Sequence, residues 1–311
     1  MAEHAMYFTD ERAQRMYKIR TGILKGLVYL FLSVFALFML FPFVIMVWGS
    51  FVEGKSFDNF KSTANFEYLG FAHWTIGNYE QILTNRAAES FPVFFLNTII
   101  VAVSSTTVTV VTAVLAAFAF ARLNFKGRDA LFALLLATMM VPGEMMVITN
   151  YQTVSALQWK NTFAALIFVH GVSVFYIFYL RQTFQQIPNE LYLAAKVDGV
   201  GDLGYLVKVM IPIAMPTVTT IIILSMMGSW NSYIWPNLVA NGYWKYNRNH
   251  SMKLVSNGLR DLFSSISGSG QPASDTLKIA GSMIISIPLL IVFVLFRKYI
   301  MRGVSRSGIK G

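Results

Sequence analysis

Residues 93–121 read VFFLNTIIVAVSSTTVTVVTAVLAAFAFA, a run without a single Asp, Glu, Lys or Arg. A helix needs about 20 apolar residues to cross the roughly 30 Å hydrocarbon core of a bilayer. This run is therefore long enough to span a membrane as one helix. Residues 26–48 and 283–296 are also free of charged side chains. The pattern predicts an all-α membrane protein that crosses the bilayer several times.

Composition supports a membrane location for the whole chain. Charged residues make up only 13% of the sequence, whereas about 25% is usual in a soluble domain. The net charge of +10 could indicate a nucleic-acid partner, but Lys and Arg also gather in cytoplasmic loops and contact lipid headgroups. We therefore expect a lipid partner and no nucleic acid. The absence of cysteine excludes disulfides, thiolate metal sites and thiol nucleophiles.

We predict about six transmembrane helices, at residues 23–48, 91–121, 130–148, 162–180, 211–229 and 277–296. The chain then divides into a cytoplasmic N-terminal tail, a first helix with its outer loop, a five-helix core and a cytoplasmic C-terminal tail, at residues 1–22, 23–90, 91–296 and 297–311. Within the core, residues 181–210 form a cytoplasmic loop and residues 230–276 an outer loop. This arrangement puts 16 Lys and Arg residues on the side of both termini and nine on the other. The positive-inside rule then places both termini in the cytoplasm.

The cytoplasmic loop contains a short helix with recognisable ends. Pro188 suits the first turn of a helix, and Gly199 suits the position just after its last turn. Between them, Leu191, Ala194 and Ala195 fall on one face at helical spacing. An amphipathic linker lying on the membrane is the alternative, but basic residues are too sparse here to favour it. Small side chains on that face would let another surface approach closely.

This loop resembles the EAA loop of permease subunits in binding-protein-dependent ABC importers. Ala194 and Ala195 match the family pattern, and Gly199 and Pro212 follow at the family spacing. Leu193 stands where the family has its first Glu. Further motifs resemble the carbohydrate-type, maltose-transporter-like branch: Asn97-Thr98-Ile99, AFAFARLNFKGR (117–128), Pro142, Tyr151, Asn161-Thr162, FYLRQTFQQIPNEL (178–191) and WNSYIWP (230–236).

The resemblance implies an ABC type I importer-like permease core that translocates a sugar or oligosaccharide across a bacterial-type inner membrane. The implied partners are a second, different permease subunit, an ATPase dimer that binds ATP and Mg, and an extracytoplasmic solute-binding protein. In this family the loop forms a coupling helix that docks in a groove of the ATPase. Carried over by position, the ATPase-coupling residues are Glu190, Leu191, Ala194, Ala195, Asp198 and Gly199.

The chain has no G-x-x-x-x-G-K-[ST] motif, so we expect it to bind no ATP through a P-loop and not to be an enzyme by itself. We expect no catalytic residues, metal site or bound cofactor. His170 is an ionisable residue inside a predicted span, which makes it a candidate pathway-lining group. Trp230 and Asn231 are two further candidates, although Trp230 also suits an aromatic belt at the membrane interface.

Two other classes of protein compete with this interpretation. An ion-gradient-driven secondary transporter typically has inverted repeats and broken helices that form a mid-membrane site, and the sequence shows neither an internal repeat nor many acidic residues in its spans. An intramembrane enzyme needs a nucleophile with a base, or metal ligands, and no such set is found. Dependence of uptake on ATP would separate the importer from the secondary transporter.

Overall fold

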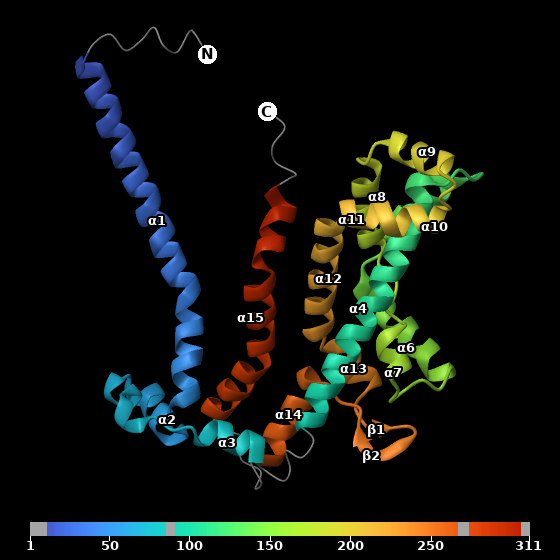
Figure 1. Ribbon diagram of the computed structural model, residues 1–311. Coiled ribbons are helices and arrows are strands. Elements are labelled where there is room, and N and C mark those ends of the chain that lie inside the picture. Colours follow the sequence, from blue (N-terminus) through green and yellow to red (C-terminus); the bar gives the residue numbers. More distant parts are fainter. Residues whose placement is uncertain (1–10, 85–90, 267–273, 306–311) are drawn as a thin grey trace. The chain divides into compact units, whose positions relative to one another are not determined.

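The computed structural model describes residues 11–84, 91–266 and 274–305, and most of them are helical (Figure 1). The ends of the predicted tails, residues 1–10 and 306–311, lie outside the described residues. The chain forms two compact units. One contains the segment up to Tyr79 together with Ser274–Met283, and the other contains the remainder.

The first unit is built on α1 (Glu11–Phe51), followed by α2 (Gly54–Thr63), two 3-10 turns (Phe66–Leu69 and Phe71–His73) and the start of α3 (Gly77–Thr84). Apolar side chains are exposed along most of the length of α1, as expected of a membrane-spanning helix. The predicted span 23–48 lies within it. Asn78 fixes the turn after α1, because its Nδ2 donates to the carbonyls of Ser50 and Val52 at 3.0 and 2.9 Å.

The second unit is organised around α4 (Phe91–Arg122). This helix packs against both α8 (Val174–Gln185) and α12 (Met215–Trp230). Ala113 and Ala117 on α4 are fully buried, and small residues such as these allow neighbouring membrane helices to approach closely. The predicted span 91–121 is therefore confirmed as one long helix at the centre of this unit.

Two predicted spans are bent rather than straight. The span predicted at 130–148 consists of α5 (Arg128–Thr138), a 3-10 turn (Gly143–Met146) and α6 (Val147–Ala156), with a bend of 85°. Pro142 accounts for the break, since proline cannot continue a helix hydrogen-bond ladder. The chain leading into α12 bends by 82°, after α10 (Asp202–Tyr205), a π-helical turn (Leu206–Met210) and α11 (Ile211–Ile213).

The span predicted at 162–180 is interrupted. It falls on α7 (Phe163–Ile167) and α8, which are separated by residues 168–173. Gly171 lies in this gap, where an added Cβ would come within 2.8 Å of the Val108 side chain on α4. Among the described residues, three helices are individually long and apolar enough to cross a bilayer, and each bent pair could add one span.

In the predicted outer loop 230–276, residues 267–273 lie outside the described residues, and the segment around Ser251–Val255 is held by hydrogen bonds to α4. The loop contains α13 (Ile234–Val239), a short antiparallel hairpin of β1 (Tyr243–Trp244) and β2 (Asn247–Ser251), and α14 (Val255–Ile266), and it leads to α15 (Asp275–Ser305). The buried Asn97 donates from Nδ2 to the carbonyls of Ser251 and Lys253 at 2.7 and 3.1 Å. Thr98 accepts the backbone N–H of Val255 at 2.9 Å. The Asn97-Thr98 motif therefore holds the end of the hairpin against α4.

Candidate coupling site

The short helix expected in the loop 181–210 is present as α9 (Asn189–Val197), directly after Pro188. Asp198 forms its C-terminal cap, and Gly199 follows with a φ of +73°. An added Cβ at Gly199 would meet nothing within 4 Å. Glycine is therefore suited to this position by its backbone conformation, which other residues adopt at a cost.

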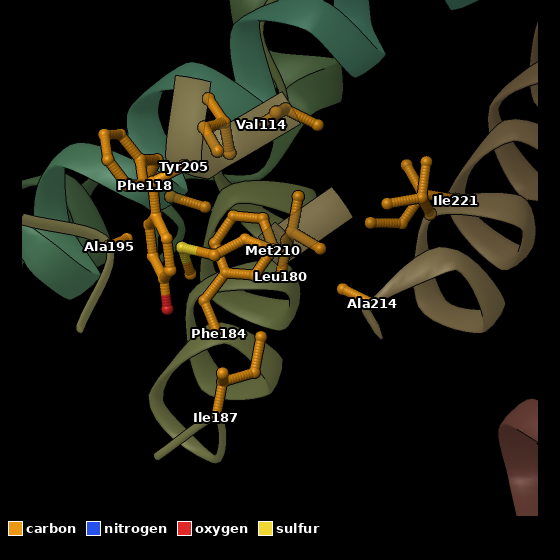
Figure 2. Packing of buried hydrophobic residues seen from close by; sticks show 13 residues of the cluster. Val114, Phe118, Leu180, Phe184, Ile187, Ala195, Tyr205, Met210, Ala214 and Ile221 are labelled. Atoms are coloured by element: carbon orange, nitrogen blue, oxygen red, sulfur yellow. The ribbon is translucent and has the colours of Figure 1, made fainter. Parts of the chain in front are cut away.

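The inner face of α9 packs against the rest of the second unit through Ala195, which is only 9% exposed. Figure 2 shows Ala195 beside the ring of Tyr205, with Met210 and Phe184 on the other side of that ring. We call the buried residues around Ala195 the inner cluster: Phe118, Phe184, Ile187, Tyr205, Leu206 and Met210. Because this cluster draws on α4, α8 and the segment before α12, it joins α9 to all three of these elements.

A polar contact supports the same packing. The Tyr192 hydroxyl donates to Asp202 Oδ1 at 2.7 Å, and Lys196 Nζ lies 2.7 Å from the same oxygen. The hydrogen bond to Asp202 raises the pKa of Tyr192, and the contact with Asp202 likewise raises the pKa of Lys196. Exposed ion pairs contribute only about 0–1 kcal/mol. This contact therefore orients α9, while apolar burial supplies most of its attachment.

The outer face of α9 is apolar and exposed. Leu193 is 56% exposed and Val197 is 88% exposed. Glu190, Leu191, Ala194 and Asp198 are also exposed. The predicted set therefore divides, because Ala194 lies on the outer face and Ala195 on the inner face. Adjacent helical residues are about 100° apart, so the two alanines cannot both face a docking partner squarely.

A second feature of this unit is a cavity of about 330 Å³ between α4, α8, α12 and α13. Hydroxyl groups line much of it, and the lining includes His170: Ser105, Thr109, His170, Ser173, Tyr176, Ser225, Ser229 and Ser232. The lining contains no Asp, Glu, Lys or Arg. The arrangement can offer hydrogen bonds to an uncharged polar molecule.

Of the three candidate pathway residues, His170 alone lines this cavity. Trp230 is 5% exposed, donates from Nε1 to the carbonyl of Ile285 at 3.3 Å and meets the Phe95 ring edge-on. Asn231 is exposed, and its Nδ2 donates to the carbonyl of Met227 at 2.9 Å. Trp230 thus joins α12 to α15, and Asn231 closes the end of α12.

The serines on α4 and α12 that line the cavity were not predicted as a site. The hydroxyl oxygens of Ser105 on α4 and Ser229 on α12 lie 3.0 Å apart, at hydrogen-bond distance. No short sequence motif predicts this pairing. Over the part of the chain that the structure describes, no group of three or more His, Asp or Glu residues is placed to hold a metal ion.

Comparison with known proteins identifies the family. Residues 109–306 match the model of the binding-protein-dependent transport system inner membrane component family. The chain therefore belongs to this family of permeases, as the resemblance in the loop and its flanking motifs indicated.

Two relatives and one solved structure illustrate the match. The chain is 28% identical to the arabinooligosaccharides transport system permease protein AraQ of Halalkalibacterium halodurans, over 76% of this chain and 80% of that protein. It is 29% identical to the trehalose/maltose transport system permease protein MalG of Thermococcus litoralis, over 94% of this chain and 100% of that protein. The structure also matches the crystal structure of a bacterial ABC transporter involved in the import of the acidic polysaccharide alginate. The TM-score is 0.72 and the sequence identity is 22%, over 93% of this chain and 98% of that chain. The last likeness establishes an ABC importer permease fold.

The two faces of α9 predict different effects of the same substitution. Ala195→Leu should overpack the inner cluster at a cost of roughly 1–3 kcal/mol, whereas Ala194→Leu on the outer face should change stability by less than about 0.5 kcal/mol. Thermal unfolding of the purified protein in detergent measures both. Equal shifts in melting temperature for the two variants would contradict the assignment of the faces.

Proposed function

We propose that this chain is the transmembrane permease subunit of an ABC importer that moves a sugar or oligosaccharide. The sugar is delivered by an extracytoplasmic binding protein, and ATP with Mg is bound and hydrolysed by a separate ATPase dimer. The exposed outer face of α9 is the observation that carries the proposal. A short helix fixed by its inner face, with an apolar outer face left uncovered, is suited to docking in a groove of another subunit.

The docking surface combines apolar and charged groups. Leu193, Ala194 and Val197 supply apolar area, and Glu190 and Asp198 flank them. In this proposal Ala195 does not contact the ATPase. It contributes indirectly, because its small side chain lets α9 lie close to the inner cluster. Gly199 ends the helix sharply enough for the chain to return to α10.

Docking is tested by adding bulk to the outer face. Ala194→Trp should weaken the complex with the ATPase, since a misfit side chain costs roughly 1–3 kcal/mol and about 1.4 kcal/mol corresponds to tenfold in affinity. The measurement is the amount of ATPase that stays on the permease through purification in detergent. Gln186→Trp, at an exposed position outside α9, is the matched control. Equal retention in both variants would overturn docking through this face.

The orientation proposed for the chain places both termini and α9 in the cytoplasm. Because the protein has no cysteine, single cysteines can be introduced without background. Asn189→Cys should react with a membrane-impermeant thiol reagent only after the cells are opened, and Ser274→Cys should react in intact cells. The reverse labelling pattern would show that the orientation is inverted.

The cavity supports an uncharged or weakly charged sugar as cargo. Its hydroxyl lining can exchange hydrogen bonds with sugar hydroxyls, and its lining holds no Lys or Arg that would select an anion. A pathway through one such chain is narrow, so we propose that it is completed by a second, different permease subunit. The names of the relatives do not decide the charge of the cargo, since arabinooligosaccharides and trehalose/maltose are neutral and alginate is acidic; the cavity lining supports this part of the proposal.

Filling the cavity tests whether cargo passes it. Gly228 lines the cavity, and an added Cβ there would meet nothing within 4 Å. Gly228→Leu should therefore leave folding and assembly intact but reduce sugar uptake. Gly143→Leu, where an added Cβ is also unobstructed, is the control outside the cavity. Uptake that is unchanged in Gly228→Leu would remove the cavity from the pathway.

A further inference from the structure

The ends of α4 and α8 are joined by two arginines, each of which contacts the backbone of the other helix. Arg122, the last residue of α4, donates from a terminal guanidinium nitrogen to the carbonyls of Phe184, at 2.8 Å, and of Ile187. Arg181 on α8 donates from Nε to the carbonyl of Phe120 at 3.2 Å. These arginines belong to the AFAFARLNFKGR and FYLRQTFQQIPNEL motifs, whose roles the docking surface does not explain.

Arg122 holds the connection between α8 and α9. Phe184 lies in the last turn of α8, where the helix end carries partial negative charge, and its carbonyl accepts both the guanidinium and the backbone N–H of Ile187, the latter at 3.3 Å. Ile187 immediately precedes Pro188, after which α9 begins. Phe184 and Ile187 are both buried, so water cannot readily replace the guanidinium at these carbonyls. A single side chain from α4 therefore fixes the turn from which α9 starts.

Arg181 joins the same region to α5. Its guanidinium lies 4.0 Å from the centre of the Phe132 ring and 3.8 Å from Asp129 Oδ1, both on α5. Its contact with Phe120 reaches the last turn of α4. Cation–π and charge-assisted contacts of this kind gain strength when partly buried. The two arginines together connect the ends of α4 and α8 with the start of α5.

We propose that Arg122 and Arg181 form a reciprocal clasp that makes α9 move together with α4 and α8 when the ATPase moves α9. This proposal rests on the proposed function. Arg122 and Arg181 are positioning residues in it, and neither touches cargo or ATP. A nine-residue helix that was free to pivot at Pro188 would absorb the movement of the ATPase instead of passing it on. Arginine suits the role because its planar guanidinium can donate to several acceptors at once, while a lysine ammonium is a point charge.

The clasp is tested in the assembled importer by spin labels on Asn124→Cys and Asn189→Cys, just beyond α4 and at the start of α9. Arg122→Met should broaden the measured distance distribution, keep ATP hydrolysis and lower the amount of sugar moved per ATP several-fold. Arg122→Lys should fall between Arg122→Met and the wild type. Lys208→Met, which removes an exposed charge from the same loop, should leave the distance distribution and the amount of sugar moved per ATP unchanged.

The outcomes separate the clasp from the importer assignment. An unchanged distance distribution and an unchanged ratio of sugar to ATP in Arg122→Met overturn the clasp. If Arg122→Met does not accumulate, the same comparison is made with Arg122→Lys, and wild-type values in that variant overturn it equally. Absence of ATP-driven uptake in the wild type would contradict the proposed function, while the distance measurement would still report on the clasp.

Discussion

The position of α9 depends on the burial of Ala195 against the inner cluster. A methyl group at this position lets the backbone of α9 lie close to Tyr205 and Met210, which come from the segment leading into α12. The same contact turns Leu193 and Val197 outward. A larger residue at position 195 would lift the helix off the cluster and rotate this apolar surface. The exposed face proposed for ATPase docking is thus a consequence of what is buried behind it.

The interrupted helices depend on a related constraint, since backbone groups within a membrane must find partners inside the protein. The gap between α7 and α8 leaves carbonyls without helical partners. Thr109 and Thr112 on α4 donate to the carbonyls of His170 and Gly171 at 3.3 and 2.8 Å. The close approach of α4 to Gly171 makes these hydrogen bonds possible. Thr109, one of these two threonines, also lines the hydroxyl-lined cavity.

Sequence reasoning succeeded where a local signal was strong. Charge-free runs predicted the long helices α1, α4 and α15, and the Pro188–Gly199 interval predicted α9 almost to the residue. The interruption at residues 168–173 was missed because its causes are contacts with α4 that no periodicity reveals. The hydrogen bond from Trp230 to Ile285 depends on α15, which is distant in sequence, so no local motif predicts it. Ala194 and Ala195 lie on different faces of α9 because of packing against the inner cluster, which the sequence alone does not reveal.

In the proposed importer, ATP hydrolysis by a partner ATPase, transmitted through α9, drives transport. The most direct measurement is sugar uptake into vesicles that contain the permease pair, the ATPase and the binding protein. Uptake should require ATP on the side of α9, should stop when the ATPase is omitted, and should continue when ionophores remove all ion gradients. Uptake that is driven by an ion gradient without ATP would contradict the account and restore the secondary-transporter interpretation.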